Sequence, residues 1–113
     1  DLIELADSFQ DEHMKICWDF GHAHINGQKQ SEALAYIGSR LKVIHVNDNT
    51  AYGDDHLPPF CGTIDWKDAM KGLNNIGFDG LFNYEIRTSN IPNSIRERFA
   101  KYLIGSAQEM LLY

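Results

Sequence analysis

The chain has 113 residues, of which 43% are hydrophobic and 23% charged, and its formal net charge is −6. This composition is typical of a soluble globular domain and argues against a disordered chain. A negative protein lacks the basic field that gathers nucleic-acid phosphates, so we expect no nucleic-acid partner. No apolar run approaches the ~20 residues that span a bilayer, and the first residues lack the basic start of a signal peptide. The two cysteines form no CxxC motif. We therefore expect a protein of the reducing cytoplasm with no membrane partner.

Helical and strand-like patterns alternate along the sequence. Apolar residues recur at helical spacing in four segments, and the short apolar runs between them are typical of buried strands. Ser31, Asp65 and Pro92 are residue types that begin helices, and Gly77 is typical of a helix end. The predicted elements are helices over 2–9, 31–41, 65–75 and 92–112, with strands over 14–19, 42–47 and 80–86.

This alternation predicts an α/β fold with parallel strands, right-handed crossovers and covering helices. We expect loops between Gly21 and Gly27 and over 48–63, and a loop as long as the second usually carries function. Three strands cannot close a barrel, because an eight-stranded βα barrel takes ~250 residues. We therefore expect residues 1–113 to form one unit of a partial barrel. Its exposed strand edges would allow self-association into a homo-oligomer.

Three residues that can bind a metal fall at equivalent places on the predicted strands. Asp19 ends the first strand, His45 sits within the second and Glu85 lies near the end of the third. Carboxyl ends of neighbouring parallel strands meet at one edge, where active sites of such folds are built. One imidazole with two carboxylates suits Mn²⁺, Mg²⁺, Co²⁺ or Zn²⁺. A lone acid at a strand end is more often a helix cap, but three such residues together favour a divalent metal site.

Five short motifs lie in and between the predicted strands, and together they resemble those of a known family. They are Trp18-Asp19-Phe20-Gly21-His22, Ile44-His45-Val46-Asn47-Asp48-Asn49, Asp54-Asp55-His56-Leu57-Pro58-Pro59, Gly62-Thr63-Ile64-Asp65-Trp66 and Tyr84-Glu85. Their order and spacing resemble those of the xylose isomerase-like TIM barrels. That superfamily includes sugar epimerases, isomerases and dehydratases of inositol catabolism, and endonuclease IV.

The resemblance implies a role for each member of the strand-end set. In that superfamily a Glu, an Asp, a His and a second Glu from the last four strands hold the metal. Asp19, His45 and Glu85 match the final three of these ligands. The chain would then be the C-terminal portion of a barrel, its last three βα units, and the first Glu would lie on a strand before Asp1. Without that Glu, we expect the metal affinity to be lower.

The resemblance also implies roles for residues outside the strands. His22 resembles a histidine that contacts the substrate or, in the endonuclease branch, an additional metal, so we expect a catalytic and substrate-binding role. Asp54 and His56 resemble the Asp-x-His pair that completes the additional metal site, and a solvated acidic loop is the alternative. From its chemistry and not from the resemblance, Arg87 is expected to neutralise a substrate oxyanion or phosphate, and an ordinary exposed arginine just past a strand is the alternative. Asp48 is expected either to orient His45 or to turn the chain.

The resemblance therefore predicts a metal-dependent isomerase or epimerase of a sugar, sugar phosphate or polyol. Glu85 and the upstream Glu would transfer the proton at a carbon next to a metal-bound carbonyl. Two alternatives stay open. One is an endonuclease IV-like phosphodiesterase that uses His22, Asp54 and His56, against which the net charge of −6 counts. The other is a non-catalytic fragment that self-associates through its strand edges.

Overall fold

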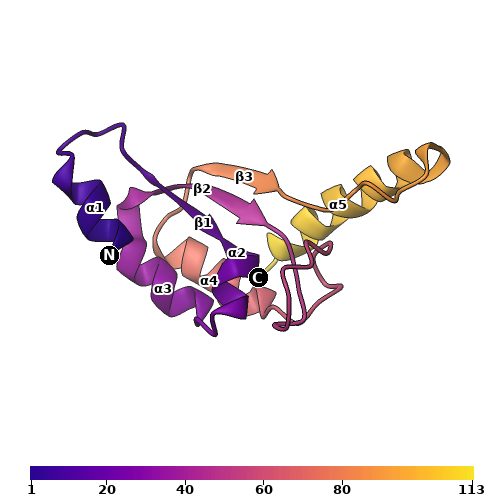
Figure 1. Ribbon diagram of the computed structural model, residues 1–113, viewed down its shortest axis with the longest axis horizontal. Helices are drawn as coiled ribbons and strands as arrows, with labels where there is room; N and C mark the ends of the chain where they lie inside the picture. The colour runs from indigo at the N-terminus through magenta and orange to yellow at the C-terminus, as the bar shows by residue number, and fades with distance from the viewer.

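The computed structural model describes residues 1–113 and contains a three-stranded sheet in the order β1-β2-β3. Figure 1 shows the sheet along one side of the molecule, with α2, α3 and α4 beneath it and α5 extending past the end of β3. The elements are α1 (Leu2–Ser8), β1 (Ile16–Asp19), α2 (Phe20–Ile25), α3 (Gln30–Ile37), η1 (Gly38–Arg40), β2 (Leu41–Val46), α4 (Trp66–Asn75), β3 (Leu81–Tyr84), η2 (Asn93–Ile95) and α5 (Arg96–Met110).

All three strands are parallel, and their register brings their carboxyl ends level. Asp19 at the end of β1 pairs with His45 on β2, and His45 pairs with Asn83 on β3. The ladder continues past β3, because the backbone N–H of Glu85 donates to the carbonyl oxygen of Val46 at 3.1 Å. Side chains alternate between the two faces of a strand, so Asp19, His45 and Glu85 share one face.

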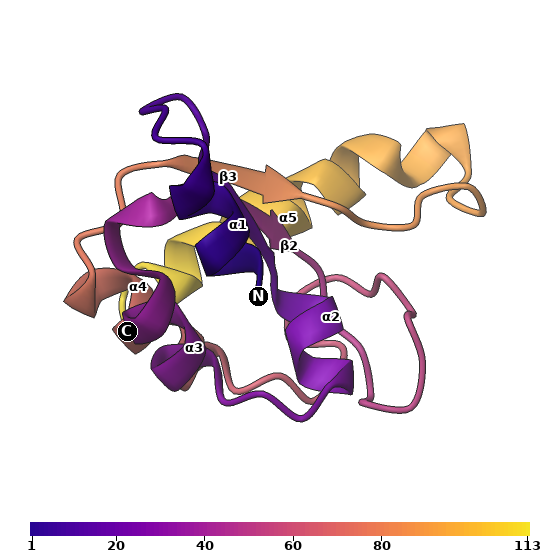
Figure 2. The same ribbon diagram turned by 60° about the vertical axis from the view of Figure 1, so that its left-hand side comes forward.

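The two faces of the sheet have different surroundings. Ile44 and Val46 of β2 are fully buried in a core that includes Leu34 of α3 and Trp66 of α4. The face that carries His45 has no helix over it, as Figures 1 and 2 show, and Leu81 at the start of β3 is 61% exposed. The sheet is therefore packed on one side only. Self-association through its edges stays a prediction.

The α/β fold with three parallel strands is confirmed, and the differences from the sequence prediction are local. The sequence predicts a loop where α2 lies, because Gly21 is a poor helix former. The Asp19 carboxylate instead accepts from the backbone N–H of His22 at 2.9 Å and caps this short helix. The predicted cap Ser31 is wrong, since α3 begins at Gln30 and the Ser31 hydroxyl donates to Asp68 Oδ1 at 2.6 Å.

Two predicted helix boundaries also differ. The helix predicted to run to residue 41 ends at Ile37, and residues 38–40 form the 3-10 turn η1. The last helix begins at Arg96 instead of Pro92, after a second 3-10 turn over Asn93–Ile95. Proline fixes a backbone angle suited to a first turn, and here it starts that short turn. No helix is both long and apolar enough to cross a lipid bilayer.

The long loop between β2 and α4 is organised around the buried carboxylate of Asp48. This carboxylate accepts hydrogen bonds from four donors: the backbone N–H groups of Asn49, Phe60 and Ile64, and the indole N–H of Trp66. Gly62 lies against it, where a Cβ would be 2.2 Å from Asp48 Oδ1. Asp48 therefore turns the chain and shapes the loop, and its carboxylate makes no hydrogen bond to His45.

Candidate metal centre

Asp19, His45 and Glu85 meet at the carboxyl ends of the strands, and we call this group the strand-end triad. One ligand atom from each residue lies within 4.8 Å of the other two. His45 Nδ1 is 2.7 Å from Glu85 Oε2 and 3.6 Å from Asp19 Oδ2. The Asp19 side chain is 13% exposed, that of His45 33% and that of Glu85 44%. The triad is therefore open to solvent on the Glu85 side.

Asp19 has a second function in the local structure. Its Oδ1 accepts the His22 backbone N–H that begins α2, and the side-chain amide of Asn47 donates to both of its oxygens at 3.2 Å. The helix cap and the triad therefore share one carboxylate. Its Oδ2 is the oxygen that faces His45.

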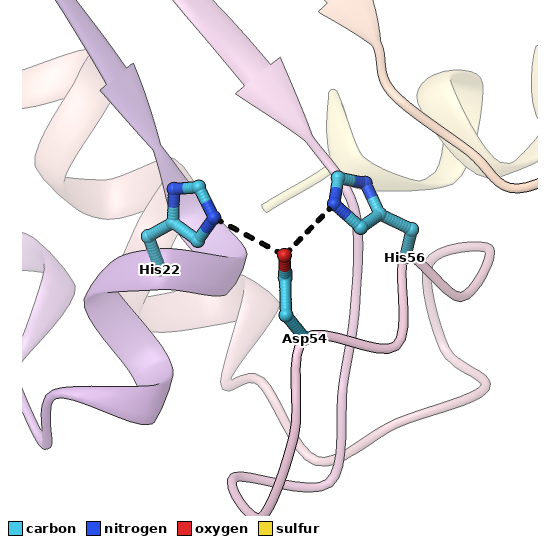
Figure 3. A group of neighbouring side chains, drawn as sticks. All are labelled: His22, Asp54 and His56. Atoms are coloured by element: carbon cyan, nitrogen blue, oxygen red, sulfur yellow. Dashed lines mark hydrogen bonds and ion pairs between the residues drawn. The ribbon is translucent and has the colours of Figure 1, made fainter.

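His22, Asp54 and His56 form a second group, which we call the loop triad, and their ligand atoms also lie within 4.8 Å of one another. His22 comes from α2, whereas Asp54 and His56 come from the loop between β2 and α4. As Figure 3 shows, both imidazoles point at one carboxylate: Asp54 Oδ2 is 3.4 Å from His22 Nε2 and 3.2 Å from His56 Nε2.

The protonation of His56 follows from its contacts. Its Nδ1 is 2.7 Å from the carbonyl oxygen of Glu85, which can only accept, so Nδ1 carries a proton. In a neutral ring, Nε2 then directs a lone pair at the Asp54 carboxylate, an arrangement that needs a proton or a cation between them. The hydrogen bond to Glu85, and next the charge of Asp54, raise the pKa of His56 against the opposing effect of burial.

Arg87 lies two residues after Glu85 and is exposed. Its backbone N–H donates to the carbonyl oxygen of His56 at 3.1 Å, so this backbone helps to hold the loop triad. Its guanidinium makes no hydrogen bond or ion pair within the chain. The structure therefore puts Arg87 at the rim without bringing its side chain into either triad.

The donor sets of the two triads suit overlapping but unequal ranges of cations. One imidazole with two carboxylates suits Mn²⁺, Mg²⁺, Co²⁺ or Zn²⁺, whereas two imidazoles with one carboxylate is a set typical of Zn²⁺. Both sets contain a ring nitrogen directed at a carboxylate oxygen, at 2.7 Å in the strand-end triad and 3.2 Å in the loop triad. With three possible protein ligands each, both sets would leave coordination positions for other oxygens on a bound cation.

Comparison with known proteins identifies the fold family. The family described as "Xylose isomerase-like TIM barrel" matches residues 1–106. The chain belongs to this family. An uncharacterized protein of Methanocaldococcus jannaschii is 29% identical over 99 residues, which are 86% of this chain and 33% of that protein. A D-psicose 3-epimerase of Enterocloster bolteae is 25% identical over 80 residues, which are 71% of this chain and 25% of the enzyme.

Solved structures give the same result for this family member. A D-tagatose 3-epimerase-like protein matches with a TM-score of 0.63 and 26% identity, over 88% of this chain and 38% of that one. A xylose isomerase domain protein from Alicyclobacillus acidocaldarius matches with a TM-score of 0.67 over 95% of this chain and 43% of that one, and its 20% identity shows the fold alone. The chain spans about a third of the proteins it matches, and its open three-stranded sheet matches part of a TIM barrel.

Two buried residues that support the strand-end triad and α2 are not predicted from the sequence to have a role there. Asn47 donates to Asp19, and Asn49 donates to the carbonyl oxygen of Gly21 at 2.9 Å. Both are fully buried. The available signal was a run of polar residues directly after a buried strand, because buried polar side chains need partners.

Proposed function

We propose that the protein containing this chain is a divalent-metal-dependent isomerase or epimerase of a sugar, sugar phosphate or polyol. The observation that carries the proposal is the meeting of Asp19, His45 and Glu85 ligand atoms within 4.8 Å. They meet at the strand edge where βα barrels build their active sites. The proposal is supported by relatives described as D-psicose 3-epimerase and D-tagatose 3-epimerase-like.

Asp19 and His45 would hold the cation, and the carboxylate of Glu85 would complete the set. When bound, a divalent cation polarises a substrate carbonyl and acidifies the adjacent C–H. The solvent-facing position of Glu85, 44% exposed, leaves its carboxylate accessible to a substrate. His22, whose ring is 59% exposed, and Arg87 would orient substrate oxygens.

Glu85 would act as the general base. The C–H bond next to the carbonyl breaks, the proton passes to the Glu85 carboxylate, and the electron pair moves toward the carbonyl oxygen. Return of a proton to the same carbon from the other side gives epimerisation. Return to the former carbonyl carbon gives isomerisation, provided that the adjacent hydroxyl passes its proton to the former carbonyl oxygen and becomes the new carbonyl. By family resemblance, the second carboxylate needed for inversion lies outside these 113 residues.

The test is Glu85→Gln in the protein that contains this chain, assayed with Mn²⁺ on ketoses in D₂O. We expect deuterium to enter the substrate carbon with wild-type protein and the rate to fall by about 100-fold or more in the variant. Glu97→Gln is the matched control, because Glu97 is 82% exposed on α5 and pairs only with Lys101. Full turnover by Glu85→Gln would remove Glu85 as the base.

The loop triad favours a second candidate function, a metal-dependent phosphodiesterase of the endonuclease IV type. Its two imidazoles and one carboxylate would hold an additional cation, and Zn²⁺ prefers such ligands. The net charge of −6 counts against a nucleic-acid substrate, so we rank this function second. Metal analysis that finds several zinc ions, together with cleavage of abasic DNA, would reverse the ranking.

A further inference from the structure

Asn47 directly follows β2 and is fully buried. Its Nδ2 group donates to both oxygens of the Asp19 carboxylate, at 3.2 Å each. Its Oδ1 is the one buried side-chain polar atom of the chain that has no hydrogen-bond partner. A buried acceptor without a partner destabilises a fold, so packing alone does not account for an amide at this position.

Gly21 provides the space for the Asn47 amide, and the Asp19 carboxylate fixes which way the amide faces. A Cβ at Gly21 would lie 1.8 Å from Asn47 Oδ1, so a larger residue leaves no room for the amide. Rotating the amide by half a turn would direct Oδ1 at the Asp19 carboxylate, and two acceptors would repel each other. Nδ2 must therefore face Asp19, and Oδ1 lies against Gly21.

These contacts determine how Asp19 presents its carboxylate. Oδ1 accepts the His22 backbone N–H at 2.9 Å, and the Asn47 amide donates to both Oδ1 and Oδ2 at 3.2 Å. Oδ2 then faces His45 Nδ1 at 3.6 Å and His22 Nδ1 at 3.8 Å. We propose that Asn47 is a positioning residue that holds Asp19 Oδ2 toward the strand-end cation site, with Gly21 providing the space for its amide. This inference rests on the proposed function, because it treats Asp19 as a metal ligand.

Asn49 provides a matched control two residues away. It is also fully buried, but both ends of its amide are satisfied: Nδ2 donates to the Gly21 carbonyl at 2.9 Å, and Oδ1 accepts the Ala51 N–H at 3.0 Å. Neither atom contacts Asp19. Asn49 thus has the burial and chemistry of Asn47 without the contact that the proposal depends on.

The experiment compares Asn47→Ala with Asn49→Ala in the protein that contains this chain. Mn²⁺ affinity is measured by calorimetry, the melting temperature by circular dichroism, and the Asp19 χ1 angle by NMR couplings without metal. We expect Asn47→Ala to weaken Mn²⁺ binding by about 10–100-fold, the usual effect of removing a group that orients a ligand. The Asp19 χ1 angle should average over rotamers. The melting temperature should change little, because Asn47→Ala removes the unfavourable unpaired Oδ1 together with the hydrogen bonds of Nδ2. Asn49→Ala should lower the melting temperature more and the Mn²⁺ affinity less.

The outcomes separate this inference from the proposed function. A single Asp19 rotamer in Asn47→Ala, or equal losses of affinity in the two variants, would overturn the inference. If the wild-type protein binds no Mn²⁺ but the Asp19 χ1 angle averages over rotamers only in Asn47→Ala, Asn47 still positions Asp19 and the metal assignment is wrong.

Gly21→Ala tests the same contact from the other side. The new methyl group should displace the amide, so we expect both the Mn²⁺ affinity and the melting temperature to fall. Adding Asn47→Ala removes the clash, and the double variant should regain melting temperature without regaining affinity. Recovery of Mn²⁺ affinity in the double variant would contradict a role for the amide.

Discussion

The strand-end triad and the loop triad use the same kinds of side chain on different supports. Members of the first lie at the ends of parallel strands, where the sheet register sets their separation. Two members of the second, Asp54 and His56, lie in a loop whose shape depends on the hydrogen bonds of buried Asp48. The geometry of the first triad is thus built into the sheet, whereas that of the second also depends on a loop that one buried carboxylate shapes.

Two residues join the triads. The two ring nitrogens of His22 face Asp19 at 3.8 Å and Asp54 at 3.4 Å. Glu85 directs its carboxylate at His45, and its carbonyl oxygen accepts the proton of His56 Nδ1. The triads are neighbours with separate supports, so a variant can remove one support and leave the other in place.

The largest expected effect is that of Asp48→Ala. Asp48 accepts from four donors, and each donor left buried without a partner costs about 1–3 kcal/mol, so we expect the free energy of unfolding to fall by about 3 kcal/mol or more. The loop triad should lose its order before the strand-end triad does. Urea denaturation measures the stability, and the histidine NMR signals of His56 and His45 report the two triads.

Asp55→Ala is the control for this prediction. Asp55 lies in the same loop, but its carboxylate accepts only from Thr50 Oγ1, at 3.4 Å. We expect little change in stability or in the His56 signal. An unchanged His56 signal in Asp48→Ala would mean that the loop holds its shape without the buried carboxylate, and the proposed difference between the two triads would be wrong.

The next effect compares two helix caps, Asp19 and Asp65. Each accepts the backbone N–H three residues on, Asp19 from His22 at 2.9 Å and Asp65 from Asp68 at 3.0 Å. Asp→Ala at either position should cost about 1 kcal/mol of stability, the usual effect of losing a cap. Only Asp19→Ala should also abolish Mn²⁺ binding in calorimetry. Equal Mn²⁺ affinity in the two variants would mean that Asp19 is a cap alone.

The sequence was sufficient for the strand-end triad and insufficient for much of the loop. A polar residue at the end of a buried strand has a defined place in a parallel sheet, so Asp19, His45 and Glu85 could be placed together from their positions. Asp54 and His56 lie in a segment without periodicity and were found only through resemblance. His56 has a positive φ of 51°, and the Asp48 bond to Trp66 joins residues 18 apart.

The helix α2 and the role of Asn47 also depend on contacts between residues far apart in the sequence, which local patterns do not predict. The helix α2 begins with Phe20-Gly21, a weak helical sequence, and depends on the Asp19 cap and on the bond from Asn49. The contact between Asn47 and Asp19 spans 28 residues. Local patterns indicate that such buried polar residues need partners, but they do not say which ones.

The smallest expected effect is the pH dependence of the loop triad in metal-free protein. The pKa of His56 is raised above 6.5, first by the Glu85 carbonyl and then by Asp54, so the folded state favours the protonated ring. The stabilisation is therefore fully present below pH 6.5, and it is lost as the pH rises through the folded-state pKa. His56→Gln should lower the melting temperature more at pH about 5.5 than at pH about 8. His13→Gln, an exposed site whose ring has no partner, should show no such difference. A bound cation would take the place of the proton between His56 and Asp54, so Zn²⁺ should reduce this pH dependence in wild-type protein. An unchanged pH profile with Zn²⁺ would mean that the loop triad does not bind the metal.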